Sequence, residues 1–136
     1  HMIRILFVCV ENSNRSQMAE AFARIHGSNL VVASSAGSSP SGAVNPRAIA
    51  AMRERGYDLG THRSKSLTEV GIGPWDYVVT MGCGDACPWL LAEHREEWDL
   101  PDPHDLGPRE FDELRDEIER RVVDLLGRIP GAAKEA

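Results

Sequence analysis

The feature that most constrains this chain is an apolar run, residues 3–9, which ends in a cysteine and is followed by a polar loop that closes on Arg15 and Ser16. The run is typical of a buried strand, and the apolar spacing after Arg15 is typical of a helix. In a strand-loop-helix unit, the loop N–H groups and the positive end of the helix converge on one point and hold a tetrahedral oxyanion there. The sequence therefore predicts an anion cradle that carries a thiol.

Two side chains give this cradle its chemistry. Arg15 presents a planar fork of donors that matches two oxygens at once. A guanidinium and a helix N-terminus also favour the thiolate form of a nearby cysteine, so Cys9 is a candidate nucleophile. The alternative is that Cys9 is a small buried hydrophobe and Arg15 a solvated helix residue, but the strand and helix around the loop favour the anion site. The residues expected to bind the anion are Val10, Glu11, Asn12, Ser13, Asn14 and Arg15.

Length, charge and cysteine content limit the classes of function. The chain has 136 residues, a net charge of −6 and three cysteines. We expect one domain over residues 3–129, a cloning remnant at residues 1–2 and a loose tail at residues 130–136. The negative charge argues against a nucleic-acid partner. No apolar run approaches the roughly 20 residues of a membrane span, so no membrane partner and a cytoplasmic location are expected. An odd number of cysteines favours catalytic or metal-binding thiols over a structural disulfide framework.

Strand and helix patterns alternate along the chain. Strands are predicted at residues 4–8, 30–33, 75–81 and 97–100, and helices at residues 15–26, 46–55, 89–94 and 108–129. This alternation predicts a three-layer α/β/α fold with a four-stranded parallel sheet and helices on both faces. Residues 57–73 are expected to form an irregular polar loop in which His62, Arg63 and Lys65 are solvated.

Four loops with reactive or polar residues follow predicted strands. They contain Cys9, Ser35, the pair Cys83 and Cys87, and Asp102. Ligands of parallel sheets bind beyond the carboxyl ends of the strands, where such loops meet. We therefore expect one edge of the sheet to collect thiols, an arginine and a carboxyl group.

The order of these motifs resembles a known family. The motifs are the opening Val8-Cys9-x5-Arg15-Ser16, the turn Ser35-Ala36-Gly37 and the pair Asp102-Pro103. Together they resemble the low-molecular-weight protein tyrosine phosphatases. The stretches NSNRSQMAEAFAR, VVTMGCGDACP and WDLPDP are similar to the arsenate reductases of that fold. The resemblance covers nearly the whole chain and implies a low-molecular-weight phosphatase-like fold with arsenate as substrate and phosphate or sulfate as competing anions.

The resemblance also implies roles for individual residues. Cys9 would be the nucleophile, Arg15 would bind the oxyanion, and Ser16 would donate a hydrogen bond to the thiolate. Asp102 would be the general acid that protonates the departing oxygen, which is a poor leaving group without a proton donor. Asp105 is the alternative candidate for that acid.

Two further thiols are needed because the reduction of arsenate to arsenite takes two electrons. Cys83 would attack the sulfur of a Cys9–arsenate adduct and release arsenite, and Cys87 would then attack the Cys9–Cys83 disulfide. Thioredoxin would reduce the resulting Cys83–Cys87 pair. The short spacing of that pair leaves open a small thiol, glutathione or mycothiol, acting with a redoxin. In that version Cys87 is a spectator.

No tightly bound cofactor is expected, with one exception that the resemblance raises. Asn12, Glu20 and Ser35 match positions that form a potassium site in some relatives, although no clear fourth ligand is present. The loop position before Arg15 is often a cysteine in this family and is Asn14 here, which affects none of the expected steps.

Two other functions remain open from the sequence. The first is a phosphatase that acts through a phospho-Cys9 intermediate, although the tyrosines that usually follow the Asp-Pro pair in such enzymes are missing. The second is a zinc-binding module that uses Cys83 and Cys87 with His62 or His94, although this cysteine pair has an unusual spacing and no second pair.

Overall fold

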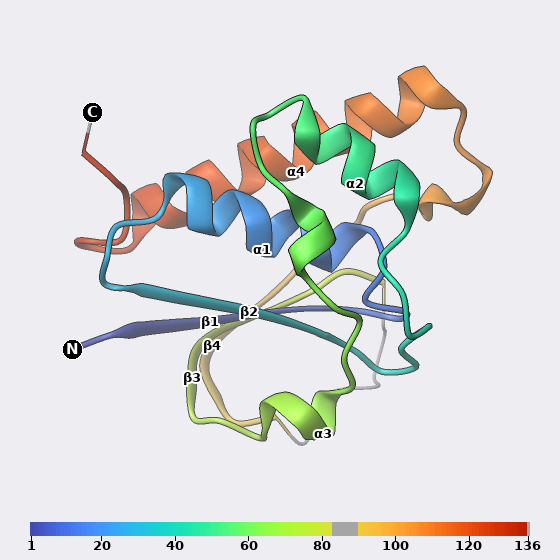
Figure 1. Cartoon of the computed structure of the whole chain (residues 1–136). Coiled ribbons are helices and arrows are strands. Elements are labelled where there is room, and N and C mark those ends of the chain that lie inside the picture. The colour runs from blue at the N-terminus through green and yellow to red at the C-terminus, as the bar shows by residue number, and fades with distance from the viewer. Residues whose placement is uncertain (83–89, 136) are drawn as a thin grey trace.

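Four parallel strands form a single sheet, as the sequence predicts (Figure 1). The computed structural model describes residues 1–82 and 90–135. The strands are β1 (Ile3–Cys9), β2 (Val31–Gly37), β3 (Trp75–Thr80) and β4 (Ala92–Glu97). Their order is β2-β1-β3-β4, and all three pairings are parallel. The carboxyl end of β1, which carries Cys9, therefore lies in the interior of the sheet.

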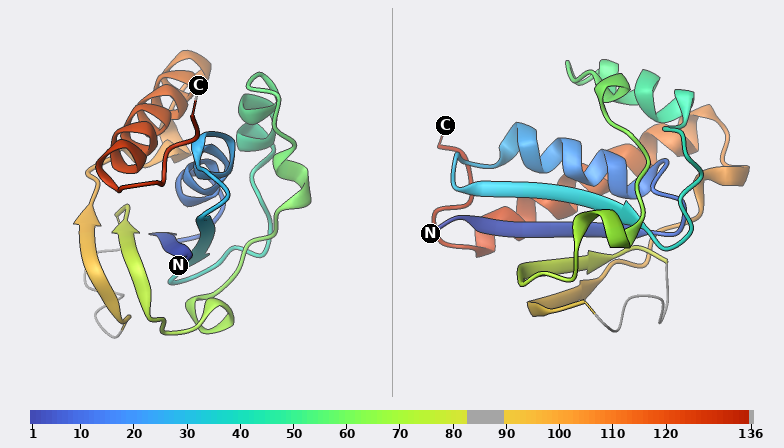
Figure 2. Two further views of the ribbon diagram at one scale, coloured as in Figure 1. Left: turned by 90° about the vertical axis from the view of Figure 1, so that its left-hand side faces the viewer. Right: turned by 60° about the horizontal axis from the view of Figure 1, so that its bottom comes forward.

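The helices cover the two faces of the sheet unequally (Figure 2). They are α1 (Arg15–His26), α2 (Pro46–Arg53), α3 (Leu67–Val70) and α4 (Pro108–Arg128). The long helices α1 and α4 lie on one face together with α2, whereas the one-turn α3 lies on the other. The α/β class and the layered fold are thus as predicted, with a thin second helical layer.

Alternation along β1 determines which way Cys9 faces. Ile5, Phe7 and Cys9 belong to the core on the α1 and α4 side, whereas Leu6 and Val8 belong to the core on the α3 side. Successive side chains of a strand point to opposite faces. The thiol is therefore directed toward α1, the helix that begins at Arg15.

The prediction was wrong for the segment before the last helix. Residues 92–97, partly assigned to a helix at residues 89–94, form the edge strand β4, and the predicted strand at residues 97–100 is mostly loop. Helix-forming residues such as Glu and Arg dominate this segment, but propensity is a weak prior against backbone pairing with a neighbouring strand. Trp98 and Leu100, which suggested the later strand, are buried as loop residues in the larger core.

Two other segments are more ordered than expected. The strand predicted at residues 30–33 continues through Ser35 to Gly37, which pairs with Cys9 in the parallel register. The expected irregular stretch 57–73 contains the 3₁₀ turn η1 (Leu59–Thr61) and helix α3. Ser66 and Glu69 form a capping box at the start of α3, a signal that is visible in the sequence.

The expected loose tail is held against the rest of the domain. Ala132 is fully buried, and its carbonyl accepts a hydrogen bond from the Ser28 N–H at 2.7 Å. The Lys134 N–H donates to the His26 carbonyl at 2.8 Å. Backbone hydrogen bonds to the end of α1 and the residues after it therefore hold residues 132–134, which the sequence predicted to be loose.

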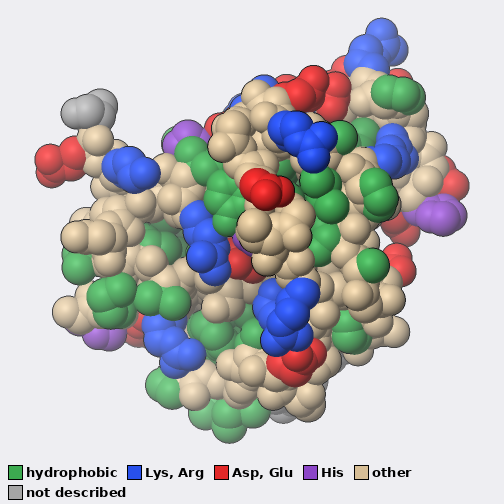
Figure 3. Space-filling view, viewed as in Figure 1, with side chains coloured by type: hydrophobic (Ala, Val, Ile, Leu, Met, Phe, Trp, Pro, Cys, Tyr) green, Lys and Arg blue, Asp and Glu red, His purple; other side chains and the backbone are tan. Residues whose placement is uncertain are grey.

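The surface and the helices bear on possible partners. In the space-filling view, Lys and Arg side chains are interspersed with Asp and Glu on the face shown (Figure 3). Positive charge on this face is therefore dispersed and does not form one basic surface. No helix in the described part of the chain is long and apolar enough to cross a membrane.

Candidate active site

The loop between β1 and α1 turns its carbonyl groups outward. N–H donors outside the cradle bind six consecutive carbonyls: Ser38 to Cys9 at 3.2 Å, Ser39 to Val10 at 2.7 Å, Ser41 to Glu11 at 3.1 Å, Gln17 Nε2 to Asn12 at 3.1 Å, Asn45 to Ser13 at 3.1 Å and Met18 to Asn14 at 3.0 Å. In a trans peptide the C=O and the following N–H point in opposite directions. Carbonyls held outward therefore leave the loop N–H groups directed inward, as an anion cradle requires.

Two local features allow this tight loop. Asn12 has a φ of 51°, a left-handed conformation that asparagine tolerates better than most residues. Gly37, at the end of β2, packs so closely that a Cβ there would lie 2.6 Å from the Val10 carbonyl oxygen. The small residue that the sequence places at this strand end is therefore required by the approach of the loop.

Cys9 is almost fully buried, and its sulfur lies 2.9 Å from the Ser16 hydroxyl. The Asn12 side-chain amide donates to the same hydroxyl oxygen at 2.8 Å. Because Ser16 accepts from Asn12, its own proton is available for the sulfur. The three residues form a directed series of donors that stabilises negative charge on Cys9.

Arg15 and Asp102 line one small cavity with Cys9. Its volume is about 20 Å³, and its lining residues are Cys9, Glu11, Ser13, Asn14, Arg15, Asp102 and Pro103. The Arg15 side chain packs beside Gly82, whose Cβ position lies 2.8 Å from a guanidinium nitrogen. The segment after β4 thus brings a carboxyl group to the cavity that Cys9 and Arg15 form at the end of β1.

Asp102 is oriented by the short turn that follows it. Its Oδ1 accepts a hydrogen bond at 3.0 Å from the His104 N–H at the start of η3 (Pro103–Asp105). This contact fixes the orientation of the Asp102 carboxyl group, with Oδ1 toward η3. Asp105, the alternative candidate for the acid, is exposed as Asp102 is, but unlike Asp102 it is not among the residues that line the cavity.

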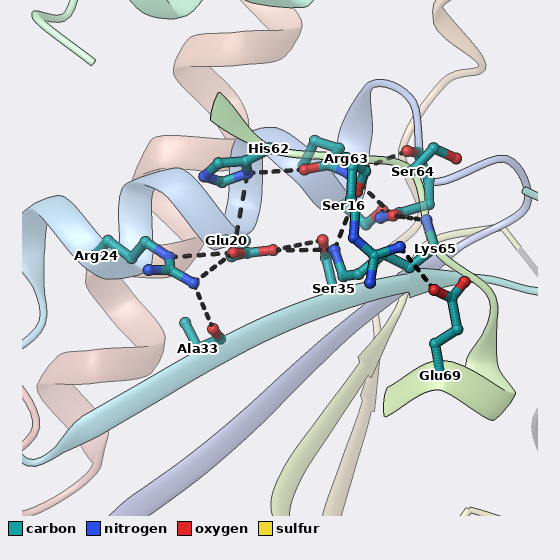
Figure 4. A network of polar contacts seen from close by, with 12 residues as sticks. Ser16, Glu20, Arg24, Ala33, Ser35, His62, Arg63, Ser64, Lys65 and Glu69 are labelled. Atoms are coloured by element: carbon teal, nitrogen blue, oxygen red, sulfur yellow. Dashed lines mark hydrogen bonds and ion pairs between the residues drawn. The ribbon is translucent and has the colours of Figure 1, made fainter. Parts of the chain in front are cut away.

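A second polar cluster lies behind the cradle and centres on Glu20, whose side chain is only 5% exposed (Figure 4). Arg24 donates to Glu20 Oε2 at 2.8 and 3.0 Å, and the Ser35 hydroxyl donates to Oε1 at 2.6 Å. The Lys65 ammonium lies 3.9 Å from Oε1. Burial lowers the pKa of Lys65 from its usual 10.5, and the nearby Glu20 carboxylate opposes that lowering.

His62 connects this cluster to the loop through Gln17. The Gln17 Oε1 lies 2.8 Å from His62 Nδ1, and the Tyr57 hydroxyl lies 2.6 Å from His62 Nε2. Burial lowers the pKa of His62, and burial also raises the pKa of Tyr57. Both shifts favour a neutral imidazole whose Nδ1–H donates to Gln17 and whose Nε2 accepts from Tyr57.

These contacts separate the site residues that the sequence identified from those that it missed. Of the predicted site residues, the cavity is lined by Cys9, Glu11, Ser13, Asn14, Arg15 and Asp102, and Ser16 contacts Cys9. Val10 and Asn12 are not among its lining residues, and Cys83 and Cys87 lie outside the described residues. Gln17 and the segment carrying His62 and Lys65 were not expected to support the loop. That segment crosses in front of α1 and β2 in Figure 1, a long-range contact with no periodic signal in the sequence.

The zinc-module interpretation loses one of its ligands in this structure. Both ring nitrogens of His62 already have hydrogen-bond partners within the protein. His94 stacks on Tyr77, with ring centroids 4.7 Å apart, on the edge strand. Across the described residues, 1–82 and 90–135, no group of three or more His, Cys, Asp or Glu side chains is placed to hold a metal ion.

Comparisons with known proteins agree with this geometry. Residues 4–135 match the family of low molecular weight phosphotyrosine protein phosphatases. The glutaredoxin arsenate reductase of a Synechocystis strain is 36% identical over 131 residues, covering 94% of this chain and 99% of that protein. A solved arsenate reductase in the phosphate-binding state has a TM-score of 0.82 at 35% identity, covering 94% of this chain and 99% of that one. A thioredoxin-dependent arsenate reductase from Corynebacterium glutamicum has a TM-score of 0.78 at 35% identity, covering 91% of this chain and 60% of that one. The chain therefore belongs to the low-molecular-weight phosphotyrosine protein phosphatase family, and arsenate reductases are among its relatives.

Proposed function

We propose that this protein reduces arsenate to arsenite in the cytoplasm. The observation that carries the proposal is the small cavity in which Cys9, Arg15 and Asp102 meet. A cradle of inward N–H groups beside a guanidinium suits a compact tetrahedral oxyanion, and phosphate and sulfate would compete for it. Relatives named as arsenate reductases match nearly the full length of the chain.

The first step forms a covalent adduct. The Cys9 thiolate, held by the Ser16 hydroxyl at 2.9 Å, attacks arsenic, and one arsenic–oxygen bond breaks. Arg15 and the loop N–H groups hold the remaining oxygens, whose charge is shared among several donors. Asp102 gives its proton to the departing oxygen, which leaves as water or hydroxide according to its own protonation.

The second step reduces arsenic. A Cys83 thiolate attacks the Cys9 sulfur, the sulfur–arsenic bond breaks, and its electron pair stays on arsenic as arsenite leaves. Two thiols are oxidised to one disulfide, which balances the two electrons that arsenic gains. Gly82, the last described residue before Cys83, lies against Arg15, so the chain enters this segment beside the cradle.

Regeneration of Cys9 completes the proposed cycle. Cys87 attacks the Cys9–Cys83 disulfide, frees Cys9 and leaves a Cys83–Cys87 disulfide for an external reductant. Thioredoxin, or glutathione or mycothiol with a redoxin, would reduce that disulfide. One relative is named as a glutaredoxin arsenate reductase and another as a thioredoxin-dependent one, so the experiment below tests both kinds of reductant.

The test combines arsenite detection with an NADPH-coupled assay. Reduced protein is mixed with arsenate and with thioredoxin and its reductase, then separately with a glutathione or mycothiol system, with Cys9→Ser as the inactive control. Arsenite formation under at least one system supports the proposal. No arsenite under any system, together with fast hydrolysis of an aryl phosphate through Cys9, would replace it with the phosphatase function.

A second experiment examines the relay itself. We expect Cys87→Ser to accumulate a Cys9–Cys83 disulfide that peptide mapping detects after one turnover with arsenate. Cys83→Ser is expected to form the adduct and then stall. If both variants release arsenite at the wild-type rate and accumulate neither the adduct nor the disulfide, reduction proceeds by another thiol and the proposed relay is wrong.

A further inference from the structure

The potassium site that the family resemblance implies is filled by the protein's own groups. Asn12 was expected to be one ligand, but its side-chain oxygen accepts hydrogen bonds from Gln17 Nε2 and from the Lys65 backbone N–H, both at 2.9 Å. An amide oxygen has two lone pairs, so both are in use. The Asn12 main-chain oxygen also accepts from Gln17, at 3.1 Å.

The other two expected ligands are committed in the same way. Both oxygens of the Glu20 carboxylate have partners, since Arg24 binds Oε2 and the Ser35 hydroxyl donates to Oε1 at 2.6 Å. The Lys65 ammonium lies 3.9 Å from Oε1 and donates to the Arg63 carbonyl at 3.2 Å. The side chains of Glu20 and Lys65 are 5% and 17% exposed, so this pairing is largely shielded from solvent.

Charge balance points the same way. The carboxylate of Glu20 contributes one negative charge, and Arg24 and Lys65 lie against it as two cations. The neutral form of His62, which burial favours, adds no charge. A potassium ion at this position would be a third cation beside one carboxylate in a partly dehydrated setting, where like charges repel more strongly than in water.

We propose that Lys65 is the resident cation of this site, so that the protein does not need potassium to order its anion loop. The ammonium supplies the positive charge behind the loop, and the backbone N–H of the same residue holds Asn12. Asn12 in turn donates to Ser16, which lies against the sulfur of Cys9. Lys65 is a positioning residue: its backbone N–H connects to the thiol through Asn12 and Ser16. Its ammonium contacts Glu20, as Figure 4 shows.

The inference deepens the proposed function, because it concerns how Cys9 is prepared for attack. Its test uses readouts that need no arsenate. The first is the rate at which iodoacetamide alkylates Cys9, followed by peptide mapping at fixed pH. The second is the midpoint of thermal unfolding. If the protein proves not to reduce arsenate, both readouts still decide whether Lys65 replaces a potassium ion.

For the wild-type protein we expect no potassium-specific effect. The alkylation rate and the unfolding midpoint should be equal in KCl, NaCl and choline chloride at a constant ionic strength of about 0.1 M, which fixes the screening. A bound ion would stabilise the folded state by mass action. A rise in midpoint or rate that is specific to potassium would therefore overturn the proposal, whatever the variants do.

For Lys65→Ala we expect a potassium requirement to appear. The substitution removes the ammonium but keeps the backbone N–H that binds Asn12, so it separates the charge from the backbone contact. In choline chloride the alkylation of Cys9 should slow about fivefold, the scale of one partly shielded ion pair, and KCl should restore most of the rate. Lys65→Arg, which keeps the charge, should retain the wild-type rate in every salt.

Lys134→Ala is the matched control, since it removes the same charge from the exposed end of the chain. It should leave both readouts at their wild-type values. An unchanged rate of Cys9 alkylation in Lys65→Ala in all three salts would contradict the proposal. If Lys65→Ala fails to fold, a potassium-insensitive wild type with an active Lys65→Arg supports the proposal, and a potassium-sensitive wild type refutes it.

Discussion

The Asn12 side-chain amide donates to the Ser16 hydroxyl at 2.8 Å, and this contact determines where the hydroxyl proton points. A serine hydroxyl that already accepts one hydrogen bond directs its own proton elsewhere, and the nearest acceptor is the Cys9 sulfur at 2.9 Å. The orientation of a donor toward the nucleophile therefore depends on the side-chain amide of Asn12, a residue whose backbone belongs to the anion loop. Asn12 and Ser16 act as a unit.

The first prediction concerns Asn12→Gly. Glycine adopts the φ of 51° that Asn12 has, so the backbone conformation stays accessible while the side-chain amide is removed, together with its contacts to Gln17 and to the Lys65 N–H. We expect alkylation of Cys9 at neutral pH to slow about 10-fold, because without Asn12 the Ser16 proton is no longer directed at the thiolate, and a hydrogen bond to a charged group contributes roughly 1.5–3 kcal/mol. Ser16→Ala should slow it by a similar factor, and the double variant should be little slower than either single one. Additive losses would mean that the two residues act independently.

The second prediction concerns the general acid. Asp102→Asn keeps an oxygen that can accept from the His104 N–H, so η3 stays in place, but it removes the proton donor. The single-turnover rate of arsenate-dependent loss of the Cys9 thiol should fall about 10²- to 10⁴-fold. Phosphate protection of Cys9 against alkylation should remain.

Asp105→Asn is the control for that experiment, because Asp105 lies on the same short turn but not in the cavity lining. It should retain the wild-type single-turnover rate. A large loss in Asp105→Asn and a small one in Asp102→Asn would reverse the assignment of the acid.

The part of the site that the sequence predicts is the part attached to strand ends. Cys9 and Arg15 follow the apolar strand β1, and Asp102 follows β4, a strand whose position the sequence predicted wrongly. Parallel topology brings the ends of both strands to one edge whatever the details of packing. The support behind the loop could not be predicted in this way. His62 and Lys65 lie in a polar segment with no periodicity, and they are partly buried because residues 57–66 cross α1 and β2.

The third prediction tests how Arg15 is held. Gly82 has a φ of 84°, and a Cβ there would lie 2.8 Å from a guanidinium nitrogen of Arg15. Gly82→Ala should therefore displace the guanidinium and weaken phosphate binding about tenfold, the loss of one charge-assisted hydrogen bond. Titration calorimetry with phosphate measures the effect.

Gly42→Ala controls for backbone strain in that comparison. Gly42 has a similar φ of 90°, and its Cβ position has nothing within 4 Å. This variant should lose stability from the strained backbone but bind phosphate with wild-type affinity. Equal losses of affinity in both variants would show that strain, and not the contact with Arg15, weakens binding.

The fourth prediction concerns pH and follows from the buried His62. Its pKa in the folded protein lies below the usual 6.5, chiefly because burial disfavours the charged imidazolium. The unfolded chain therefore binds this proton more readily than the folded one, and the free energy of unfolding rises with pH across that interval. The stability is fully present above about pH 6.5 and is lost as the pH falls toward the lower, folded-state pKa, with a slope of at most about 1.4 kcal/mol per pH unit for one proton.

Urea unfolding of the wild type and of His62→Gln across this range measures this dependence. The free energy of unfolding should change less steeply with pH in the variant. His104→Gln, at an exposed position, should keep the wild-type slope. A His62→Gln profile as steep as that of the wild type would show that another group is protonated on unfolding and that the Tyr57–His62–Gln17 chain is not what couples stability to pH.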